Sequence, residues 1–244
     1  METDFERYRI GEVFRSRKNR VFKIRFKGET RVAKVHSQMN SSAANAEYQL
    51  LARCSERRLL VPAPLELAEN TIVMTYLEGP NLGDLADVLL SGGPPPRDRD
   101  EITIDSLAKG LANWLASFHK AFDNELCRGD TILRNFLLSS RQIYGLDFEE
   151  AHKGDPILDM GEICANILGM RPMFGRLNFI FASKVVSEYW RATGKDRSAD
   201  IPEAIAMGLE HYAKFRQDGG LLMEWARKFR SERTVLGEQT VPEA

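Results

Sequence analysis

The stretch from Arg128 to Asn135 places one aspartate, Asp130, five residues before an asparagine, and a second aspartate, Asp147, follows a short β-type run. Carboxylate and carboxamide oxygens suit Mg²⁺, and a carboxylate can also accept the proton of a hydroxyl group. Chemistry of this kind requires a fold that brings all three side chains near one point. A structural turn aspartate followed by an Asx cap is the alternative for the Asp-x4-Asn spacing taken alone.

The composition is ordinary for a globular chain: 244 residues, 43% hydrophobic, 28% charged, with a net charge of −1. This total gives no reason to expect a nucleic acid or a membrane surface as partner. Residues 1–79 contain 14 Lys and Arg against 10 Asp and Glu, a net of +4, and the remainder contains 20 against 25, a net of −5. A basic first part suits phosphate binding and an acidic second part suits a cationic substrate, with random scatter of surface charge as the alternative.

The cysteines and the first residues bear on where the protein works. Cys54, Cys127 and Cys164 are widely spaced and form no CxxC pair, which argues against a disulfide framework or a zinc site. The first residues are charged and unlike a signal peptide, and no apolar run has membrane-spanning length. We therefore expect a soluble cytoplasmic protein.

Residues 1–79 are predicted to form a small first domain of strands with one inserted helix. Alternating apolar and basic residues indicate strands within 8–36, and further strands are expected within 65–76. Asn40 to Ser42 offer helix caps, and the helix is expected over 43–57. Its apolar stripe, formed by Ala43, Leu50, Leu51 and Cys54, contains one carboxylate, Glu47. A carboxylate on such a face is costly unless it meets a cation, so either Glu47 pairs with a cation or it escapes to the edge.

Residues 80–244 are predicted to form a larger, mainly helical second domain. The Gly-Pro step at 79–80 separates the two, and the proline run after Ser91 predicts an irregular loop. Two short β-type runs are expected at 136–138 and 143–146, and the residues around Gly237 are expected to fray. The hydrophobic periodicity predicts helices over 82–90, 105–122, 157–170, 176–193, 202–216 and 219–232.

The motifs follow one another in a recognisable order. Val32-Ala33-Lys34 on a strand, Glu47 on a helix, the segment Met74–Gly79, and the Arg128–Asn135 loop followed by Leu146-Asp147-Phe148 resemble the protein-kinase-like superfamily. Within it, the chain is similar to the aminoglycoside phosphotransferase and choline-kinase-like branch, over nearly its whole length. The resemblance implies an α+β, bilobal protein-kinase-like fold, with a small antiparallel-sheet N-lobe carrying one helix and a larger, mainly helical C-lobe.

The resemblance also implies a nucleotide site for ATP. Lys34 would neutralise its phosphates, and Glu47 would pair with Lys34 and hold the ammonium in place. The backbone carbonyl of Thr75 and the backbone amide of Leu77 would receive the adenine ring. Taken alone, a strand lysine such as Lys34 is a solvated surface charge.

The same resemblance assigns the chemistry to the second half of the chain. Asp130 would be the catalytic base, while Asn135 and Asp147 would hold Mg²⁺. Asp159 would brace the backbone of the catalytic loop. Asp155 stands just before Pro156, a residue that can start a helix, so its position by itself indicates a helix cap. Arg134 could reach the transferring phosphoryl group or could pair with a nearby carboxylate.

Three departures from the family pattern stand out. Arg128 replaces a histidine that mostly packs and hydrogen-bonds, so the local bracing must differ. Glu149 replaces a glycine. The usual Gly-rich loop is missing, so Ser16 or the basic side chains of 15–20 would hold the phosphates, unless this segment is only a solvated hairpin tip.

Three functions are compatible with these residues. The first is a small-molecule kinase that moves the γ-phosphoryl group of ATP to a hydroxyl, suggested by the short stretch between Asp147 and Asp155-Pro156 and by the lack of an Ala-Pro-Glu motif. The second is a compact protein kinase of the RIO type, which also lacks a long activation segment. The third is a non-catalytic nucleotide sensor, suggested by the altered loop and by Arg128. The acceptor of the first would be an amine- or guanidine-bearing molecule or a neutral sugar.

Overall fold

The computed structural model describes residues 9–14, 16, 18–37, 41–93, 102–231 and 236. The expected helix cap Asn40, the basic side chains of Arg15 and Arg17, the prolines of the loop after Ser91 and the tail around Gly237 lie outside these residues. The described chain forms two compact units. One contains the described residues up to Gly79 together with Tyr144–Glu149, and the other contains those of Pro80–Ile143 and those after Glu149.

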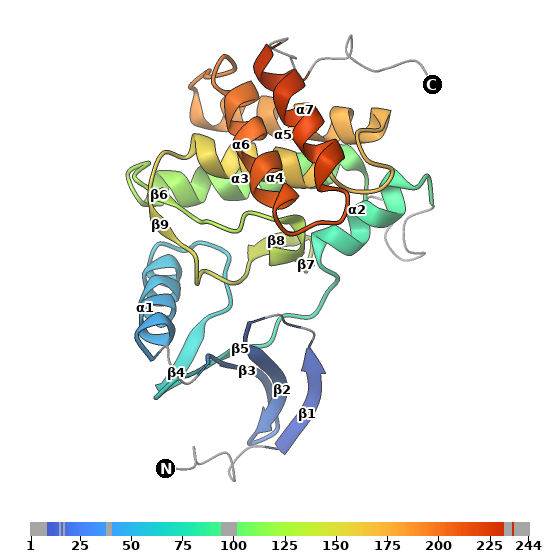
Figure 1. Ribbon diagram of the computed structural model, residues 1–244. Helices are drawn as coiled ribbons and strands as arrows, with labels where there is room; N and C mark the ends of the chain where they lie inside the picture. Colours follow the sequence, from blue (N-terminus) through green and yellow to red (C-terminus); the bar gives the residue numbers. More distant parts are fainter. Residues whose placement is uncertain are drawn as a thin grey trace. The chain divides into compact units, whose positions relative to one another are not determined.

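The first unit is an antiparallel sheet with one helix (Figure 1). Its strand order is β1-β2-β3-β5-β4, and α1 lies in the chain between β3 and β4. The strands and helix are β1 (Arg9–Phe14), β2 (Arg20–Phe26), β3 (Glu29–Val35), α1 (Ser41–Glu56), β4 (Pro64–Ala68) and β5 (Thr71–Thr75).

The β2–β3 hairpin sets the register of the lysine strand. Lys27 and Gly28 both have positive φ, 49° and 87°, which suits a two-residue turn between right-twisted strands. Pairing then runs from Phe26 opposite Glu29 to Val21 opposite Lys34. Ile24 is buried with Ala33 and Val73, whereas Lys34 lies one residue further along β3.

The helix α1 presents its buried face as expected, with one difference. Ala44 is fully buried, whereas Ala43 is only half-buried, so the stripe runs through Ala44, Glu47, Leu51 and Cys54. This is the i, i+3, i+7, i+10 spacing of one helical face. Glu47 is 2% exposed, so the carboxylate does not escape to the edge.

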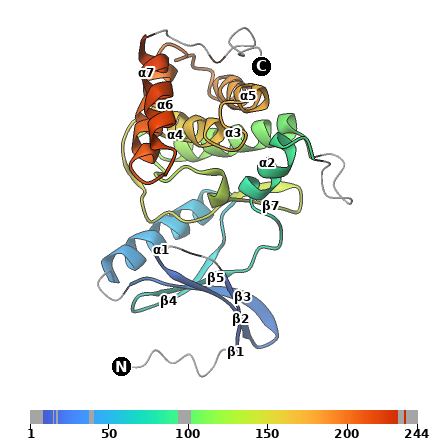
Figure 2. The ribbon, with the colours of Figure 1, turned by 45° about the vertical axis from the view of Figure 1, so that its right-hand side comes forward.

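The second unit is mainly helical (Figures 1 and 2). α4 packs against α5 and α6, α3 packs against α5, and α6 packs against α7. β6 pairs with β9 in a two-stranded antiparallel ladder that the sequence did not predict, and the β7–β8 hairpin leads the chain back into the first unit. The elements are α2 (Leu82–Leu90), α3 (Ile104–Ala121), β6 (Leu126–Cys127), η2 (Leu133–Asn135), β7 (Phe136–Ser139), β8 (Gln142–Gly145), β9 (His152–Lys153), α4 (Ile157–Leu168), α5 (Arg176–Thr193), α6 (Ile201–Ala213) and α7 (Gly219–Ser231).

Small residues let α4 approach α6 closely. A Cβ on Gly161 would overlap the backbone of Ala204, and a Cβ on Gly208 would lie 2.8 Å from the side chain of Ala165. This contact fixes α4 at the centre of the unit, where most of its side chains are buried. The polar side chains that α4 carries are therefore held by a packed core.

Candidate active site

Lys34 is the centre of a buried charge network in the first unit. Its Nζ donates to both carboxylate oxygens of Glu47, at 2.9 and 2.7 Å, and to Oδ1 of Asp147 at 2.7 Å. The side chain of Lys34 is only 7% exposed. Burial would lower the pKa of Lys34, but the charges of Glu47 and Asp147 outweigh it and raise that pKa. The Lys34–Glu47 ion pair expected from the sequence is therefore present, and Lys34 is no solvated surface lysine.

Glu47 is held from three sides. Besides Lys34, the backbone N–H of Phe148 donates to Oε1 at 3.0 Å, and Nε2 of the buried His36 lies 2.9 Å from Oε2. Burial alone would raise the pKa of Glu47, but its contacts with His36, Lys34 and Phe148 lower that pKa to about 2. Sequence reasoning missed His36, whose only signal was its position two residues after Lys34, just beyond the end of β3.

Two further carboxylates face the same lysine. Asp147 has a left-handed backbone with φ of 58°, and its side chain is 43% exposed, so the carboxylate lies partly at the surface. Glu149 lies 3.9 Å from the Lys34 ammonium and accepts a hydrogen bond from the carboxamide of Asn19 at 2.5 Å. The Glu149 that replaces a glycine of the family pattern thus ties down the β1–β2 hairpin tip.

Ser16 contributes to the conformation of that tip. Its Oγ accepts a hydrogen bond from the backbone N–H of Asn19 at 3.3 Å, and its side chain is exposed. The hydroxyl therefore serves the turn between β1 and β2. Arg15 and Arg17, on either side of it, lie outside the described residues.

Thr75 and Leu77 lie at the end of the sheet. Thr75 ends β5, and its side-chain oxygen accepts a hydrogen bond from the backbone N–H of Ala63 at 2.9 Å. Leu77 is half-buried two residues later. Between them, the ring of Tyr76 stacks on Phe14, so the segment after β5 is held next to the sheet.

Asp130 and Asn135 lie together in the second unit. The Asn135 carboxamide donates to Oδ2 of Asp130 at 3.0 Å and to the Asp130 carbonyl oxygen at 2.9 Å. Asp130 is exposed and has a positive φ of 41°, an uncommon backbone conformation for a residue other than glycine. The carboxylate is thus presented to solvent by a loop whose shape is fixed from behind.

Helix α4 supplies most of that support. Asp159 accepts hydrogen bonds from the backbone N–H groups of Arg128 and Gly129, at 2.6 and 3.1 Å, and from the Thr131 hydroxyl at 2.8 Å. Burial would raise the pKa of Asp159, but its contact with His119 and these hydrogen bonds lower that pKa. Asp159 therefore braces the loop as the sequence predicts.

Two further side chains of α4 continue the same contact. Glu162 accepts from the backbone N–H of Thr131 at 2.7 Å, and the Asn166 carboxamide oxygen accepts from the backbone N–H of Leu133 at 3.0 Å. Burial raises the pKa of Glu162, and the charges of Asp159 and Asp130 add to that rise. Sequence reasoning missed both residues, although three polar residues at i, i+3 and i+7 on an otherwise apolar helix are a detectable signal.

Behind Asp159 lies a buried pair that the sequence did not indicate. His119 is fully buried, its Nε2 is 2.9 Å from Asp159 Oδ2, and its Nδ1 is 2.8 Å from the Tyr189 hydroxyl. Because an ionised carboxylate only accepts, Nε2 donates to Asp159; in the neutral ring, Nδ1 then accepts from Tyr189. A continuous chain of hydrogen bonds runs from Tyr189 on α5 to the backbone of the Arg128–Asn135 loop.

Arg128 has a structural role that explains its place. The side chain is fully buried, and its guanidinium donates to the carbonyl oxygens of Gly129 at 2.9 Å, Asp130 at 2.7 Å and Asn135 at 3.4 Å. The guanidinium carbon also lies 4.9 Å from the centre of the Phe136 ring. The planar guanidinium of Arg128 thereby ties the two ends of the loop to each other. A histidine could not donate to three carbonyl oxygens in this way.

Gly129 and Arg134 flank the same aspartate. Gly129 has φ of 65°, and a Cβ there would overlap the carbonyl oxygen of Glu150, so only glycine fits. Arg134 pairs with Asp84 at 2.9 Å and with Asp87 at 3.1 Å on α2. Of the two roles considered for Arg134, the structure contains the carboxylate pairing.

A family model described as the RIO domain matches residues 6–152, which is more than half of the chain. The chain belongs to the RIO domain family. The matched RIO domain includes Lys34, Glu47, the Arg128–Asn135 loop and Asp147, and it ends within β9. Helices α4 to α7, including Asp159 and the other loop-bracing side chains of α4, follow the RIO domain in the chain.

Three solved structures resemble this RIO domain protein over nearly its whole length. A protein assigned as an aminoglycoside phosphotransferase from Ralstonia eutropha JMP134 is 13% identical, with a TM-score of 0.57 over 91% of this chain and 89% of that one. The amicoumacin kinase hAmiN, solved with AMP-PNP, Ca²⁺ and Ami, is 14% identical, with a TM-score of 0.57 over 98% and 91%. Choline kinase from Cryptosporidium parvum Iowa II is 10% identical, with a TM-score of 0.53 over 95% and 89%.

These likenesses concern the fold of the RIO domain protein and confirm the expected α+β, protein-kinase-like class. No curated protein matches its sequence. Its three cysteines are buried and free, and burial raises the pKa of each thiol to about 12. In the part of the chain that the structure describes, no helix is long and apolar enough to cross a membrane.

Proposed function

We propose that this RIO domain protein is an ATP-dependent phosphotransferase that moves the γ-phosphoryl group to a hydroxyl of a small molecule. The observation that carries the proposal is the Lys34 ammonium held between Glu47 and Asp147, at 2.7 Å from each. A buried lysine fixed by one fully buried carboxylate and one half-exposed carboxylate is poised to exchange the second contact for a phosphate. Thr75 and Leu77 would receive the adenine through their backbone groups, and Ser16 would contact the phosphates.

Mg²⁺ is the metal that such a reaction implies, and the donors available fit it. Asp147 and Asn135 offer carboxylate and carboxamide oxygens. Among the described residues, no three His, Cys, Asp or Glu side chains are grouped as a metal site, so few protein oxygens would hold the ion, with ATP phosphates supplying others. When bound, Mg²⁺ would neutralise phosphate charge.

Asp130 would act on the acceptor. Its carboxylate is exposed, and the Asn135 carboxamide orients it. In this role Asp130 accepts the proton of the substrate hydroxyl as that oxygen attacks the γ-phosphorus atom, and ADP leaves. Arg128 and Asp159 hold the loop that presents Asp130. This structural role of Arg128 weakens the argument that its presence in place of a histidine indicates a non-catalytic protein.

The short connection after Asp147 favours a small acceptor. Only residues 148–156 separate Asp147 from α4, and within them β9 is already paired with β6. Protein kinases other than the compact RIO type use a long segment at this position as a platform for an extended peptide. The amicoumacin and choline kinases, to which the fold is similar, are named for small molecules.

A compact protein kinase of the RIO type is the second candidate, and the family match favours it. Labelled ATP distinguishes the two. A small-molecule kinase transfers label to members of a library of hydroxyl-bearing metabolites and releases ADP in proportion, whereas a protein kinase labels protein with no small acceptor present. Transfer to protein alone would reverse our choice between them.

A matched pair of variants tests the residue assignment. Asp130→Asn should reduce turnover by about 10²- to 10⁴-fold, because the carboxamide cannot accept the proton. Asp123→Asn, at an exposed aspartate that also has positive φ, should leave turnover unchanged. Equal turnover of the two variants would contradict the role given to Asp130.

A further inference from the structure

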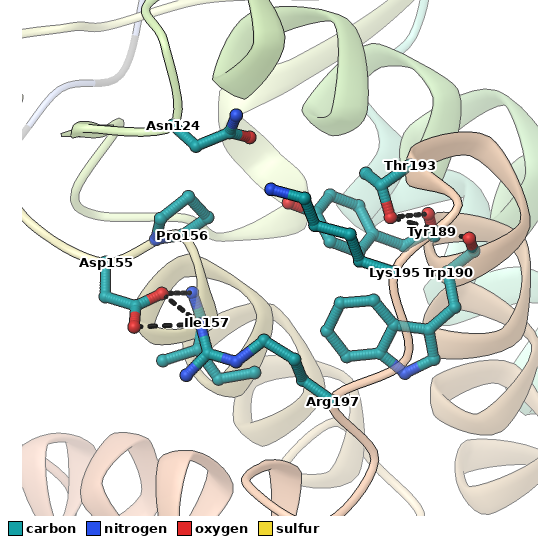
Figure 3. Close-up of a pocket in the computed structure, with 9 residues that line it drawn as sticks. All are labelled: Asn124, Asp155, Pro156, Ile157, Tyr189, Trp190, Thr193, Lys195 and Arg197. Atoms are coloured by element: carbon teal, nitrogen blue, oxygen red, sulfur yellow. Dashed lines mark hydrogen bonds and ion pairs between the residues drawn. The ribbon is translucent and has the colours of Figure 1, made fainter.

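A cavity of about 340 Å³ lies in the second unit, between the end of α5 and the start of α4 (Figure 3). This volume is near the lower end of the range for pockets that hold small organic ligands. Pro156 and Ile157 come from the start of α4, Tyr189 and Trp190 come from the end of α5, and Lys195 follows α5. None of them belongs to the proposed nucleotide or catalytic residues.

The apolar lining of the cavity suits a flat ring. Trp190 offers an indole, and Pro156 and the buried Ile157 add aliphatic surface. The indole Nε1 of Trp190 is buried and has no hydrogen-bond partner among the described residues. Because this nitrogen has no exposed surface, the indole would contribute its ring rather than this N–H to the binding of a ligand.

The charges of the cavity favour a negative group on that ligand. Arg197 is already occupied, since its guanidinium binds both oxygens of Asp155, at 2.6 and 2.8 Å, and its Nε binds Asp200 at 2.8 Å. Lys195 has an exposed side chain, and Figure 3 shows its ammonium extended toward the carboxamide of Asn124. The ammonium and the carboxamide N–H groups are donors that suit a carboxylate.

One wall of the cavity is joined to the catalytic loop. The Tyr189 ring lines the cavity, and its hydroxyl is hydrogen-bonded to His119, which is bonded to Asp159. Asp159 in turn holds the backbone N–H groups of Arg128 and Gly129. A ligand that immobilises the Tyr189 ring would therefore stabilise the support of the loop that carries Asp130.

We propose that this cavity binds a small ring-bearing carboxylate, and that binding stabilises the catalytic loop through Tyr189, His119 and Asp159. The binding step is independent of the proposed function. The consequence for catalysis rests on that function.

Benzoate, benzyl alcohol and benzylamine, which share a ring and differ in charge, are the probes for the binding step. The measurement is the NMR resonance of the Trp190 indole N–H, followed during titration with each probe. Benzoate should shift this resonance at the lowest concentration and benzylamine at the highest. Lys195→Gln should weaken benzoate binding by about fivefold, the effect of one exposed ion pair, whereas Lys184→Gln, within the preceding helix α5, should not.

Equal affinity for the three probes, tighter binding of benzylamine, or an unchanged Trp190 resonance would overturn the site. Equal affinities of the Lys195→Gln and wild-type proteins for benzoate would overturn the role of Lys195. These readouts need neither ATP nor an acceptor, so they remain decisive even if the protein is no phosphotransferase.

Amide hydrogen exchange tests the link to the loop. Saturating benzoate should slow exchange at Arg128 and Gly129 in the wild-type protein. In Tyr189→Phe, which keeps the ring and removes the hydroxyl, benzoate should still bind but leave this exchange unchanged. Wild-type exchange that does not respond to bound benzoate, or a response that persists in Tyr189→Phe, would overturn the coupling.

Discussion

Replacing Glu47 by glutamine tests the buried charge network of the first unit. The carboxylate is 2% exposed, and its pKa falls from 4.5 to about 2 in the folded protein. A difference of this size corresponds to about 3 kcal/mol of folding free energy that the ionised carboxylate contributes and that glutamine cannot supply. We therefore expect Glu47→Gln to lower the free energy of unfolding at pH 7 by about 3 kcal/mol.

The pH dependence of this loss follows from the direction of the shift. Because the folded pKa of Glu47 is depressed, the unfolded chain binds more protons than the folded chain between pH 2 and 4.5. The contribution of Glu47 is complete above that window and disappears as the pH falls through it. The gap between the wild-type and Glu47→Gln proteins should therefore shrink from about 3 kcal/mol at pH 7 to about 1 kcal/mol at pH 3.

Denaturant unfolding followed by circular dichroism, at several pH values from 3 to 7, measures this gap. Glu56→Gln is the matched control, because Glu56 lies on the same α1 helix and is exposed. Its curve should follow that of the wild type throughout. A gap for Glu47→Gln that is constant with pH, or equal to that of Glu56→Gln, would refute the account of Lys34 and Glu47.

Changes at four other positions test the loops. Arg128→Met should destabilise the protein by at least about 2 kcal/mol, because three carbonyl groups lose a charged donor, and Arg128→Lys should recover only part of this in denaturant unfolding. Gly129→Ala combines positive φ with a steric overlap, and thermal melting should detect a loss of several kcal/mol, roughly 2 to 4. Asp159→Asn should speed amide exchange at residues 128 and 129, since a carboxamide accepts more weakly there. Asn19→Ala should speed amide exchange of the β1–β2 tip without changing exchange in α4.

The elements of the fold were largely predictable because their signals are local. The helices of residues 82–90 and 176–193 were expected with the bounds that α2 and α5 have, and the other helices differ by a few residues at their ends. The β6–β9 ladder was not predicted. Its strands have two residues each, too few for an alternating pattern, and their pairing depends on the path of the whole second unit.

The residues of the candidate site were likewise predictable only where a local pattern or the resemblance marked them. A carboxylate on an apolar helix face needs a cation, so Glu47 could be expected to pair with one, and the resemblance named Lys34 as the partner. Asp159 could likewise be assigned to the loop by resemblance. Asn19 and Glu149 are separated by 130 residues, and His119 and Tyr189 by 70, so no spacing in the sequence links them. Arg128 was unexplained from the sequence because its partners are backbone carbonyls, which leave no mark on side-chain identity.

Isothermal titration of the protein with ATP, in the presence and absence of Mg²⁺, tests the central proposal most directly. We expect Mg²⁺-dependent binding that Lys34→Met weakens by at least about tenfold and that Asp130→Asn leaves unchanged, since Lys34 meets the phosphates and Asp130 meets the acceptor. Absence of binding, or equal binding by the wild-type and Lys34→Met proteins, would contradict the assignment of a nucleotide site to Lys34, Glu47 and Asp147.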